Sequence, residues 1–227
     1  HKHAVHILAN YSDQGNHLLF EAQRMIYAGA FFPEFKEAPA WRKSGIDILN
    51  REINVQVYND GGQFELDPHY HLAAINIFCK ALGIADVNGF RNEFPQEYLD
   101  TIEKMIMFYA NISFPDYTNP CFSDAKITEK KEMLKNYREW SKLFPKNETI
   151  KYLATDGKEG ALPDYMSKGF LKSGFFVFRN SWGMDATQMV VKAGPKGFWH
   201  CQPDNGTFEM WFNGKNLFPD SGSHVYA

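Results

Sequence analysis

The stretch LPDYMSKGF, residues 162–170, separates two kinds of sequence in this chain of 227 residues. Before it, apolar residues recur with the three- and four-residue spacing of amphipathic helices. After it, short aromatic and β-branched runs are divided by Gly, Asn and Pro, which is typical of strands. The change predicts a helical domain over residues 1–155 and an antiparallel sheet domain over residues 165–227.

The helical region is predicted to contain helices that alternate with loops. Three of them are indicated by apolar faces formed by Leu18, Leu19, Ala22, Met25, Ile26 and Gly29, by Ile46, Leu49, Ile53 and Val57, and by Tyr98, Ile102, Met105, Ile106 and Tyr109. A further helix begins after Asp67 as its N-cap, with Pro68 in the first position, and is predicted to end at Gly83. This alternation favours an incomplete α/α toroid, although no exact repeat is visible.

The strand region is predicted from the runs 174–183, 186–194 and 206–222. These runs favour the start of an antiparallel β-sandwich. The chain opens without Met, already in a helical pattern, and stops where another strand is expected. We therefore expect a piece of a longer polypeptide, whose remaining parts are partners of this one.

The composition is that of an ordinary globular protein, with 44% hydrophobic and 22% charged residues. A net charge of −3 gives no reason to expect nucleic acid as a partner, and a polyanionic ligand would need a local basic cleft. No uninterrupted apolar run is long enough to predict a membrane span. Three widely spaced cysteines indicate neither a disulfide framework nor a thiolate metal site.

Three segments combine polar side chains with glycine at the edge of a regular element. They are QGNHLLFEAQR at 14–24, GGQFELDPHYH at 61–71 and GFWHCQPDNGTFEMWFNG at 197–214. Loops of this kind carry function more often than cores do.

Tyr70 lies in the first turn of the helix that Asp67 caps. The unpaired N–H groups and the positive end of the helix dipole favour an anion there, so Tyr70 could act as a base. Alternatively, its hydroxyl is hydrogen-bonded to a loop. Asn16 and His17 lie at the start of another helix. Asn16 is either a helix cap and His17 a surface residue, or the Asn16 amide and the His17 imidazolium together bind a carboxylate.

These residue types suit one reaction in particular. Removing a proton from the carbon beside a carboxylate requires that the carboxylate be neutralised first and the enolate-like intermediate be stabilised. Asn and His donors do so without an organic cofactor, and a Tyr or His can then move the proton. This is β-elimination in a uronic acid polymer.

The third segment supplies further candidates, each with a structural alternative. His200 is either an exposed loop residue or a second base, and Trp182 and Trp199 either belong to the core or form a platform for a sugar. Four basic residues could meet sulfates or carboxylates, or are solvated strand residues: Lys172, Arg179, Lys192 and Lys196.

Together the segments resemble the heparinase II/III family of polysaccharide lyases, and within it the heparinase III branch, which cleaves heparan sulfate. The resemblance rests on GNH at 15–17, DGGQFELDPHYH at 60–71 and FWHCQPDNGTFEMWFNGKNLFPDSG at 198–222. Such proteins have an incomplete α/α toroid followed by an antiparallel β-sandwich.

The resemblance implies roles for single residues. Asn16 and His17 would neutralise the uronate carboxylate, Tyr70 would be the general acid and base, and His200 would stand opposite Tyr70. Glu65 lies in the same motif as Tyr70 and, like Trp199, is a candidate for substrate binding. In glucuronate the C5 proton and the C4 oxygen share a ring face, so Tyr70 would suffice, whereas iduronate would need His200 as the base.

The resemblance also implies one structural divalent metal ion in the β domain. Gln202 and Asp220 occupy the positions of two ligands, and any third ligand would lie beyond Ala227. Because Gln replaces the usual His, calcium and manganese become alternatives to zinc.

The sequence leaves other functions open. The chain could belong to a non-catalytic glycosaminoglycan-binding protein or to a lyase acting on another uronate polymer. Inverting hydrolysis would need two carboxylates, such as Glu65 and Asp67, and leaves Tyr70, Asn16 and His200 without a role. From the family and its substrate we expect a periplasmic or secreted bacterial protein.

Overall fold

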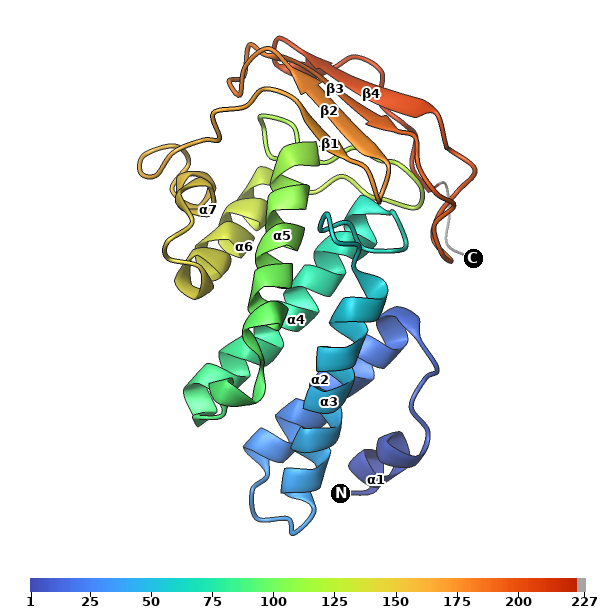
Figure 1. The fold of residues 1–227 in the computed structure, drawn as a ribbon, viewed down its shortest axis with the longest axis vertical. Helices are drawn as coiled ribbons and strands as arrows, with labels where there is room; N and C mark the ends of the chain where they lie inside the picture. Colours follow the sequence, from blue (N-terminus) through green and yellow to red (C-terminus); the bar gives the residue numbers. More distant parts are fainter. Residues whose placement is uncertain (224–227) are drawn as a thin grey trace. The chain divides into compact units, whose positions relative to one another are not determined.

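The computed structural model describes residues 1–223, with helices first and strands after them. Figure 1 shows the order of the elements. The helices are α1 Lys2–Ala9, α2 Gly15–Phe31, α3 Ala38–Gln56, α4 Pro68–Asn88, the 3-10 helix η1 Arg91–Glu93, α5 Gln96–Ile112, α6 Lys130–Leu143 and α7 Glu148–Ala154. The strands are β1 Lys168–Phe170, β2 Phe175–Arg179, β3 Thr187–Lys192, β4 Thr207–Phe212 and β5 Lys215–Asn216.

The strands form one sheet in the order β1-β2-β3-β4-β5, and every neighbouring pair is antiparallel. Each strand therefore pairs with the next one in sequence, as short connections favour. The predicted fold class, helical followed by the start of an antiparallel sheet, is confirmed.

The chain divides into two compact units. One comprises His1–Val57 and Ala73–Ile102, and the other comprises Tyr58–Leu72 and Glu103–Ala227. Secondary structure changes from helix to strand between Ala154 and Lys168, but α6 and α7 group with the sheet. The domain bounds 1–155 and 165–227 stay a prediction, and each compact unit is described below by itself.

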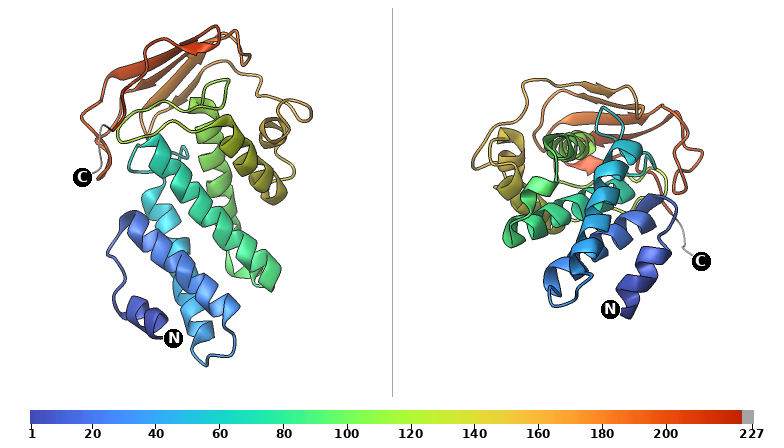
Figure 2. Two further views of the ribbon diagram at one scale, coloured as in Figure 1. Left: turned by 180° about the vertical axis from the view of Figure 1, so that it is seen from behind. Right: turned by 60° about the horizontal axis from the view of Figure 1, so that its bottom comes forward.

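In the first unit, α2 and α3 lie side by side and run in opposite directions, as both views of Figure 2 show. The predicted apolar faces are buried, with Leu19 and Leu49 at 0% exposure. The helices approach closely because glycines face the partner helix. A Cβ atom on Gly45 would lie 2.3 Å from the carbonyl oxygen of Ala22.

Helix α4 begins as predicted but ends later. It runs to Asn88, so the predicted end at Gly83 is wrong. A Cβ atom on Gly83 would have no neighbour within 4 Å, which means that this glycine sits at an open helical position and breaks nothing. The helix stops before Gly89, whose φ of +75° is the left-handed conformation of a helix C-terminus.

By length and composition, α4 could also cross a membrane, with 21 residues and a mean hydropathy of 1.2. However, 56% of that apolar window is buried within the protein. Core helices share this property, so the finding gives no support for a membrane span.

In the second unit, the sheet packs one face on aromatic residues at the end of α5 and just after it. Phe175 contacts Phe108 with ring centroids 5.3 Å apart, and Trp211 stacks with Phe114 at 5.8 Å. Side chains on strands alternate between faces. On the opposite face the aromatic rings of Phe178, Phe208 and Phe212 stay about half-exposed.

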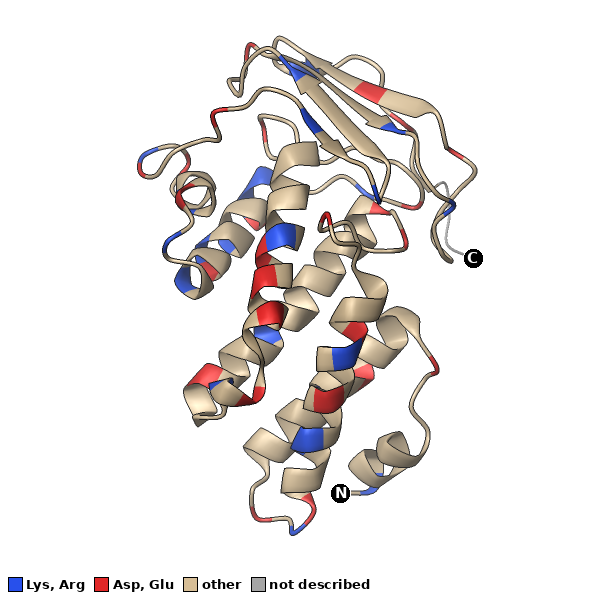
Figure 3. Cartoon of the chain, viewed as in Figure 1, with Lys and Arg blue, Asp and Glu red and all other residues tan. Residues whose placement is uncertain are grey.

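Charged residues of both signs are mixed along α3 and α6 (Figure 3). Helix α5 carries three acidic residues at three-residue spacing, Glu97, Asp100 and Glu103, with Lys104 next to them. The bulk charge therefore gives no basis for binding a polyanion.

Candidate active site

The loop before α4 is fixed to the sheet through Asp60. Its Oδ2 accepts hydrogen bonds from the backbone N–H groups of Lys172, at 2.7 Å, and Ser173, at 2.9 Å. The next two residues must be glycines. A Cβ atom on Gly61, which has φ +93°, would lie 2.4 Å from the carbonyl oxygen of Lys104, and one on Gly62 would lie 2.4 Å from Ser173 Cβ.

His71 holds the other end of this loop. Its Nδ1 accepts a hydrogen bond from the N–H of Gln63 at 3.1 Å, and its Nε2 lies 2.9 Å from the carbonyl oxygen of Met105. Since Met105 offers only an acceptor, Nε2 carries the hydrogen. Complete burial lowers the pKa of His71 to about 4, so the ring stays neutral. His71 thus links the loop to α5 through these two hydrogen bonds.

Asp67 places Tyr70 on the first turn of α4. Its Oδ1 accepts hydrogen bonds from the N–H groups of His69, at 2.7 Å, and Tyr70, at 3.0 Å. This is the predicted N-cap. Burial raises the pKa of Asp67 to about 7, against the lowering effect of these two donors.

Tyr70 and His200 come together although 130 positions separate them in the sequence. Their rings are stacked, with centroids 3.5 Å apart and planes inclined by 9°. His200 lies in the segment between β3 and β4, while Tyr70 is partly exposed at the start of α4. Both belong to the second compact unit. The structure thus joins the two residues to which the resemblance gives acid and base roles.

Two carboxylates flank the imidazole of His200. Asp124 Oδ2 lies 3.1 Å from Nδ1, and Glu65 Oε2 lies 3.9 Å from Nε2. Gln202 donates its Nε2 amide to the other Asp124 oxygen at 2.8 Å. Sequence analysis missed Asp124, because the surrounding PCFSDAKIT has no motif or spacing that connects it to His200.

Glu65 is a buried acid without a hydrogen-bonding partner among the described residues. Its exposure is 0%, and neither carboxylate oxygen receives a hydrogen bond there. Burial, together with the charge of Asp67, raises the pKa of Glu65 to about 7 against the lowering effect of the Gln63 side chain. A carboxyl group so perturbed beside a histidine is typical of functional sites.

Trp199 directly precedes His200 in the chain and is an exposed aromatic residue, with 56% exposure. Phe64 packs against it edge-to-face, with ring centroids 6.3 Å apart, and stacks with Phe198 at 4.6 Å. Phe198 and Trp199 thus expose aromatic rings next to His200 in the chain, while Phe64 is buried. Such rings can stack on a sugar ring.

Asn16 and His17 lie in the first unit, on the opening turn of α2. Gly15 before them has φ +74°. The amide oxygen and nitrogen of Asn16 are both buried and have no hydrogen-bonding partner among residues 1–223, whereas His17 is exposed. Buried polar atoms are normally paired, so an unpaired amide at this position is unusual.

The predicted metal ligands have other partners. Gln202 binds Asp124, and Asp220 Oδ1 accepts the N–H of Gly222 at 2.9 Å. Among residues 1–223, no group of three or more His, Cys, Asp or Glu side chains could hold a metal ion. The described residues therefore do not fit a metal site by themselves, and the metal stays a prediction.

Two of the basic residues considered for sulfate binding are buried. The Lys192 side chain is 2% exposed and its Nζ lies 2.6 Å from Asp204 Oδ1. The Arg179 guanidinium donates to the carbonyl oxygen of Asn111 and covers one face of Trp182, 3.5 Å from the ring centroid. Neither cation is available for a polyanion, and Trp182 has lost one stacking face.

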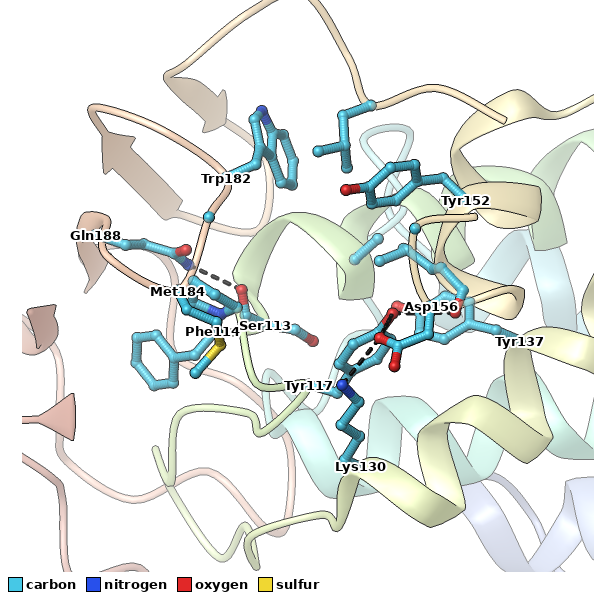
Figure 4. A pocket seen from close by; sticks show the side chains of 16 residues that line it. Ser113, Phe114, Tyr117, Lys130, Tyr137, Tyr152, Asp156, Trp182, Met184 and Gln188 are labelled. Carbon is cyan, nitrogen blue, oxygen red and sulfur yellow. Dashed lines mark hydrogen bonds and ion pairs between the residues drawn. The ribbon is translucent and has the colours of Figure 1, made fainter. Parts of the chain in front are cut away.

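Two hollows in the second unit differ in what lines them. One of about 200 Å³ is lined by residues that include Tyr117, Lys130, Tyr152 and Asp156, and contains none of the predicted catalytic side chains (Figure 4). The other, of about 580 Å³, borders the segment that carries His200. Its lining residues are Lys192, Pro195, Lys196, Cys201, Gln202, Pro203, Asp204 and Asn205.

Comparison with protein families gives the same assignment over nearly the whole chain. Residues 1–152 match the heparinase II/III N-terminus model, and residues 163–227 match the heparinase II/III-like C-terminal model. The chain belongs to the heparinase II/III family. The predicted resemblance is therefore confirmed.

Similar proteins within the heparinase II/III family are named as lyases. The chain is 90% identical over its 227 residues to a heparin-sulfate lyase of Bacteroides stercoris, and 51% identical to a heparin-sulfate lyase of Pedobacter heparinus. It spans 34% of the length of each of these proteins. A solved heparinase III structure matches with a TM-score of 0.93 at 99% identity, over 100% of this chain and 36% of that one.

Proposed function

We propose that the protein containing this chain is a polysaccharide lyase that cleaves heparan sulfate by β-elimination at uronic acid residues. The observation that carries the proposal is the stacked pair of Tyr70 and His200 beside the buried carboxyl of Glu65. Its relatives at 90% and 51% identity, named heparin-sulfate lyase, support the choice of substrate.

In the proposed reaction a base removes the C5 proton of the uronate. The electron pair of the C5–H bond forms the C4=C5 double bond, and the C4–O bond to the next sugar breaks. The leaving oxygen takes a proton, which Tyr70 supplies. The products are a 4,5-unsaturated uronate end and a new hydroxyl end.

Neutralisation of the uronate carboxylate is assigned to Asn16 and His17. The unpaired, buried amide of Asn16 supports this role, because it offers N–H donors that no described protein group uses. Without such donors the charge that develops next to the carboxylate would make the intermediate too unstable.

The identity of the base follows from the stereochemistry of the uronate. In glucuronate Tyr70 takes the C5 proton and returns it to the oxygen on the same face. In iduronate the proton lies on the other face, and His200 Nε2 takes it. Glu65, 3.9 Å from that nitrogen, offers a carboxylate that stabilises the imidazolium formed.

Binding of the sugar chain is assigned to the surroundings of His200. Trp199 offers an aromatic face, and the hollow of about 580 Å³ next to the segment includes the exposed Lys196. A single exposed lysine here, rather than a basic surface, suits a chain of low sulfation.

The experiment is a time course of ultraviolet absorbance, with the full-length protein on heparan sulfate and on heparin. Absorbance from the unsaturated uronate should rise faster on heparan sulfate and be lost in Tyr70→Phe. The matched control is Tyr152→Phe, which removes a phenol from the hollow of Figure 4 and should cleave normally. Unchanged cleavage by Tyr70→Phe would contradict the mechanism.

Other outcomes would select the alternatives. New reducing ends without the absorbance would mean hydrolysis, and binding without either signal would mean a non-catalytic glycosaminoglycan-binding protein. Faster cleavage of a different uronate polymer would keep the mechanism and change the substrate.

A periplasmic or secreted location, and a structural divalent metal in the complete β domain, belong to the same proposal. Fractionation of the bacterium, and metal analysis of the purified full-length protein, test these two points separately. Nothing in the proposed elimination passes through the metal.

A further inference from the structure

Asp124 contacts His200 through both its side chain and its backbone. Its carboxylate oxygen Oδ2 lies 3.1 Å from His200 Nδ1, and its backbone N–H donates to the carbonyl oxygen of His200 at 3.3 Å. The second carboxylate oxygen accepts the amide of Gln202 at 2.8 Å. Asp124 therefore fixes both the ring of His200 and the backbone that carries it.

The turn that carries Asp124 is itself immobilised by a buried ion pair. Ser123 has a left-handed backbone with φ +62°, and its N–H donates to Asp204 Oδ2 at 2.6 Å. Lys192 Nζ donates to both Asp204 Oδ1 and Ser123 Oγ, each at 2.6 Å. The segments around Ser123 and Asp204 are thus joined, and Asp124 and His200 keep one relative position.

This arrangement determines which nitrogen of His200 carries the hydrogen. An ionised carboxylate only accepts hydrogen bonds, so the contact with Asp124 requires a hydrogen on Nδ1. The neutral ring then has its lone pair on Nε2, at the opposite edge, which is the edge that points to Glu65 at 3.9 Å.

We propose that Asp124 is a positioning residue that keeps His200 in the Nδ1–H form, so that Nε2 is the atom that accepts the proton. The inference rests on the proposed elimination. In iduronate the C5 proton moves to Nε2, the C5–H electrons form C4=C5, and the leaving oxygen takes its proton from Tyr70.

The first test does not depend on turnover. The full-length protein is treated with diethyl pyrocarbonate at about pH 8, where an unperturbed histidine is neutral. The peptide containing His200 is then followed by mass spectrometry. We expect the wild type to form a single adduct on Nε2. An adduct on Nδ1 would overturn the proposal without any variant.

Replacing the carboxylate should change that reactivity. In Asp124→Asn the amide oxygen keeps the donor from Gln202, so the NH2 group faces Nδ1 and donates to it. The ring hydrogen then moves to Nε2 and removes the lone pair there. The His200 adduct should form several-fold more slowly, while exposed His17 reacts as before. An unchanged rate at His200 in a folded variant would overturn the proposal.

The second test is kinetic, on an iduronate-containing substrate. Asp124→Asn should lower kcat by roughly 10²-fold or more and change KM little, because general acid–base catalysis contributes about 10²–10⁴-fold. Asp116→Asn is the control. Asp116 lies in the same interhelical segment, and its Oδ1 accepts hydrogen bonds from the N–H of Thr118, at 3.0 Å, and from the Thr118 hydroxyl. A raised KM with unchanged kcat would assign Asp124 to binding instead and overturn the proposal.

The two tests separate the possible failures. If the wild type shows no elimination, the proposed function fails, while the Nε2 adduct still tests the position of the ring. If elimination is present and Asp124→Asn leaves both reactivity and kcat unchanged, only the inference about Asp124 fails.

Discussion

The imidazole of His200 lies flat on the phenol ring of Tyr70, with 3.5 Å between the ring centroids and 9° between the planes. Two rings at this separation are in van der Waals contact, so no sugar ring fits between them. His200 therefore does not stand across an open gap from Tyr70. The proposed mechanism therefore requires that both residues reach the substrate with the polar atoms at their ring edges, or that the rings separate when it binds.

The separate roles proposed for Tyr70 and His200 can be tested with two substrates, one containing only glucuronate and the other only iduronate as its uronic acid. His200→Ala should reduce cleavage at iduronate at least about 10-fold more than cleavage at glucuronate, because in the proposed mechanism only iduronate needs the second base. The measurement is kcat/KM on each substrate from the ultraviolet assay. Equal losses on both would mean that His200 acts by packing on Tyr70 and not on the sugar.

The N-cap of α4 should contribute to stability and to the position of Tyr70. Asp67→Ala leaves the N–H groups of His69 and Tyr70 without their acceptor, and should lower the free energy of unfolding by about 1 kcal/mol. Asp67→Asn keeps an acceptor oxygen and serves as the control. Urea unfolding of both variants checks the prediction, and equal stability of Asp67→Ala and the wild type would contradict it.

The raised pKa values of Glu65 and Asp67, both about 7, predict how stability changes with pH. Between their ordinary values near 4 and these raised values, the folded state binds more protons than the unfolded state. Stability should therefore fall as pH rises from about 5 to 7, by up to about 1.4 kcal/mol per pH unit for each group, and then level off.

Glu65→Gln should flatten this dependence, because one of the two titrating groups is gone. The measurement is urea unfolding at a series of pH values, with Glu139→Gln on the exposed face of α6 as the control. A slope as steep as that of the wild type would show that Glu65 does not titrate in this range.

The buried ion pair of Lys192 and Asp204 should be essential to the fold near the site. Lys192→Met leaves the carboxylate of Asp204 without its cation, and removing one partner of a buried pair costs about 3–5 kcal/mol. Thermal unfolding checks this value. The double variant Lys192→Met, Asp204→Leu should recover part of the loss, whereas a second loss of similar size would show that the two residues act independently.

Local patterns predicted the helices and strands well where packing follows the period of the element. The faces of α2 and α3 are buried as expected, and Asp67 caps α4. The predicted end of α4 at Gly83 was wrong. Although glycine disfavours helices, Gly83 lies at an open helical position and does not end this one. Whether a glycine ends a helix depends on its surroundings.

The candidate site was predictable only in part. Tyr70 and His200 were found from motifs, whereas Asp124 was missed because its contact with His200 joins residues 76 positions apart. Lys192 and Arg179 were considered as cations for the substrate, but they are buried by partners distant in sequence, Ser123 and Asn111 among them. Such pairings depend on the assembled fold and leave no local pattern.

The hydrogen bonds from Asp60 to the turn between β1 and β2 make opening of the loop measurable by hydrogen exchange. Its carboxylate holds the backbone N–H groups of Lys172 and Ser173, and these hydrogens exchange with solvent deuterium only when the bonds open. Their exchange rates therefore report how often the hydrogen bonds between Asp60, in the loop that carries Glu65, and this turn of the sheet break. Slower exchange at Lys172 and Ser173 in the presence of the sugar chain would mean that substrate closes this loop.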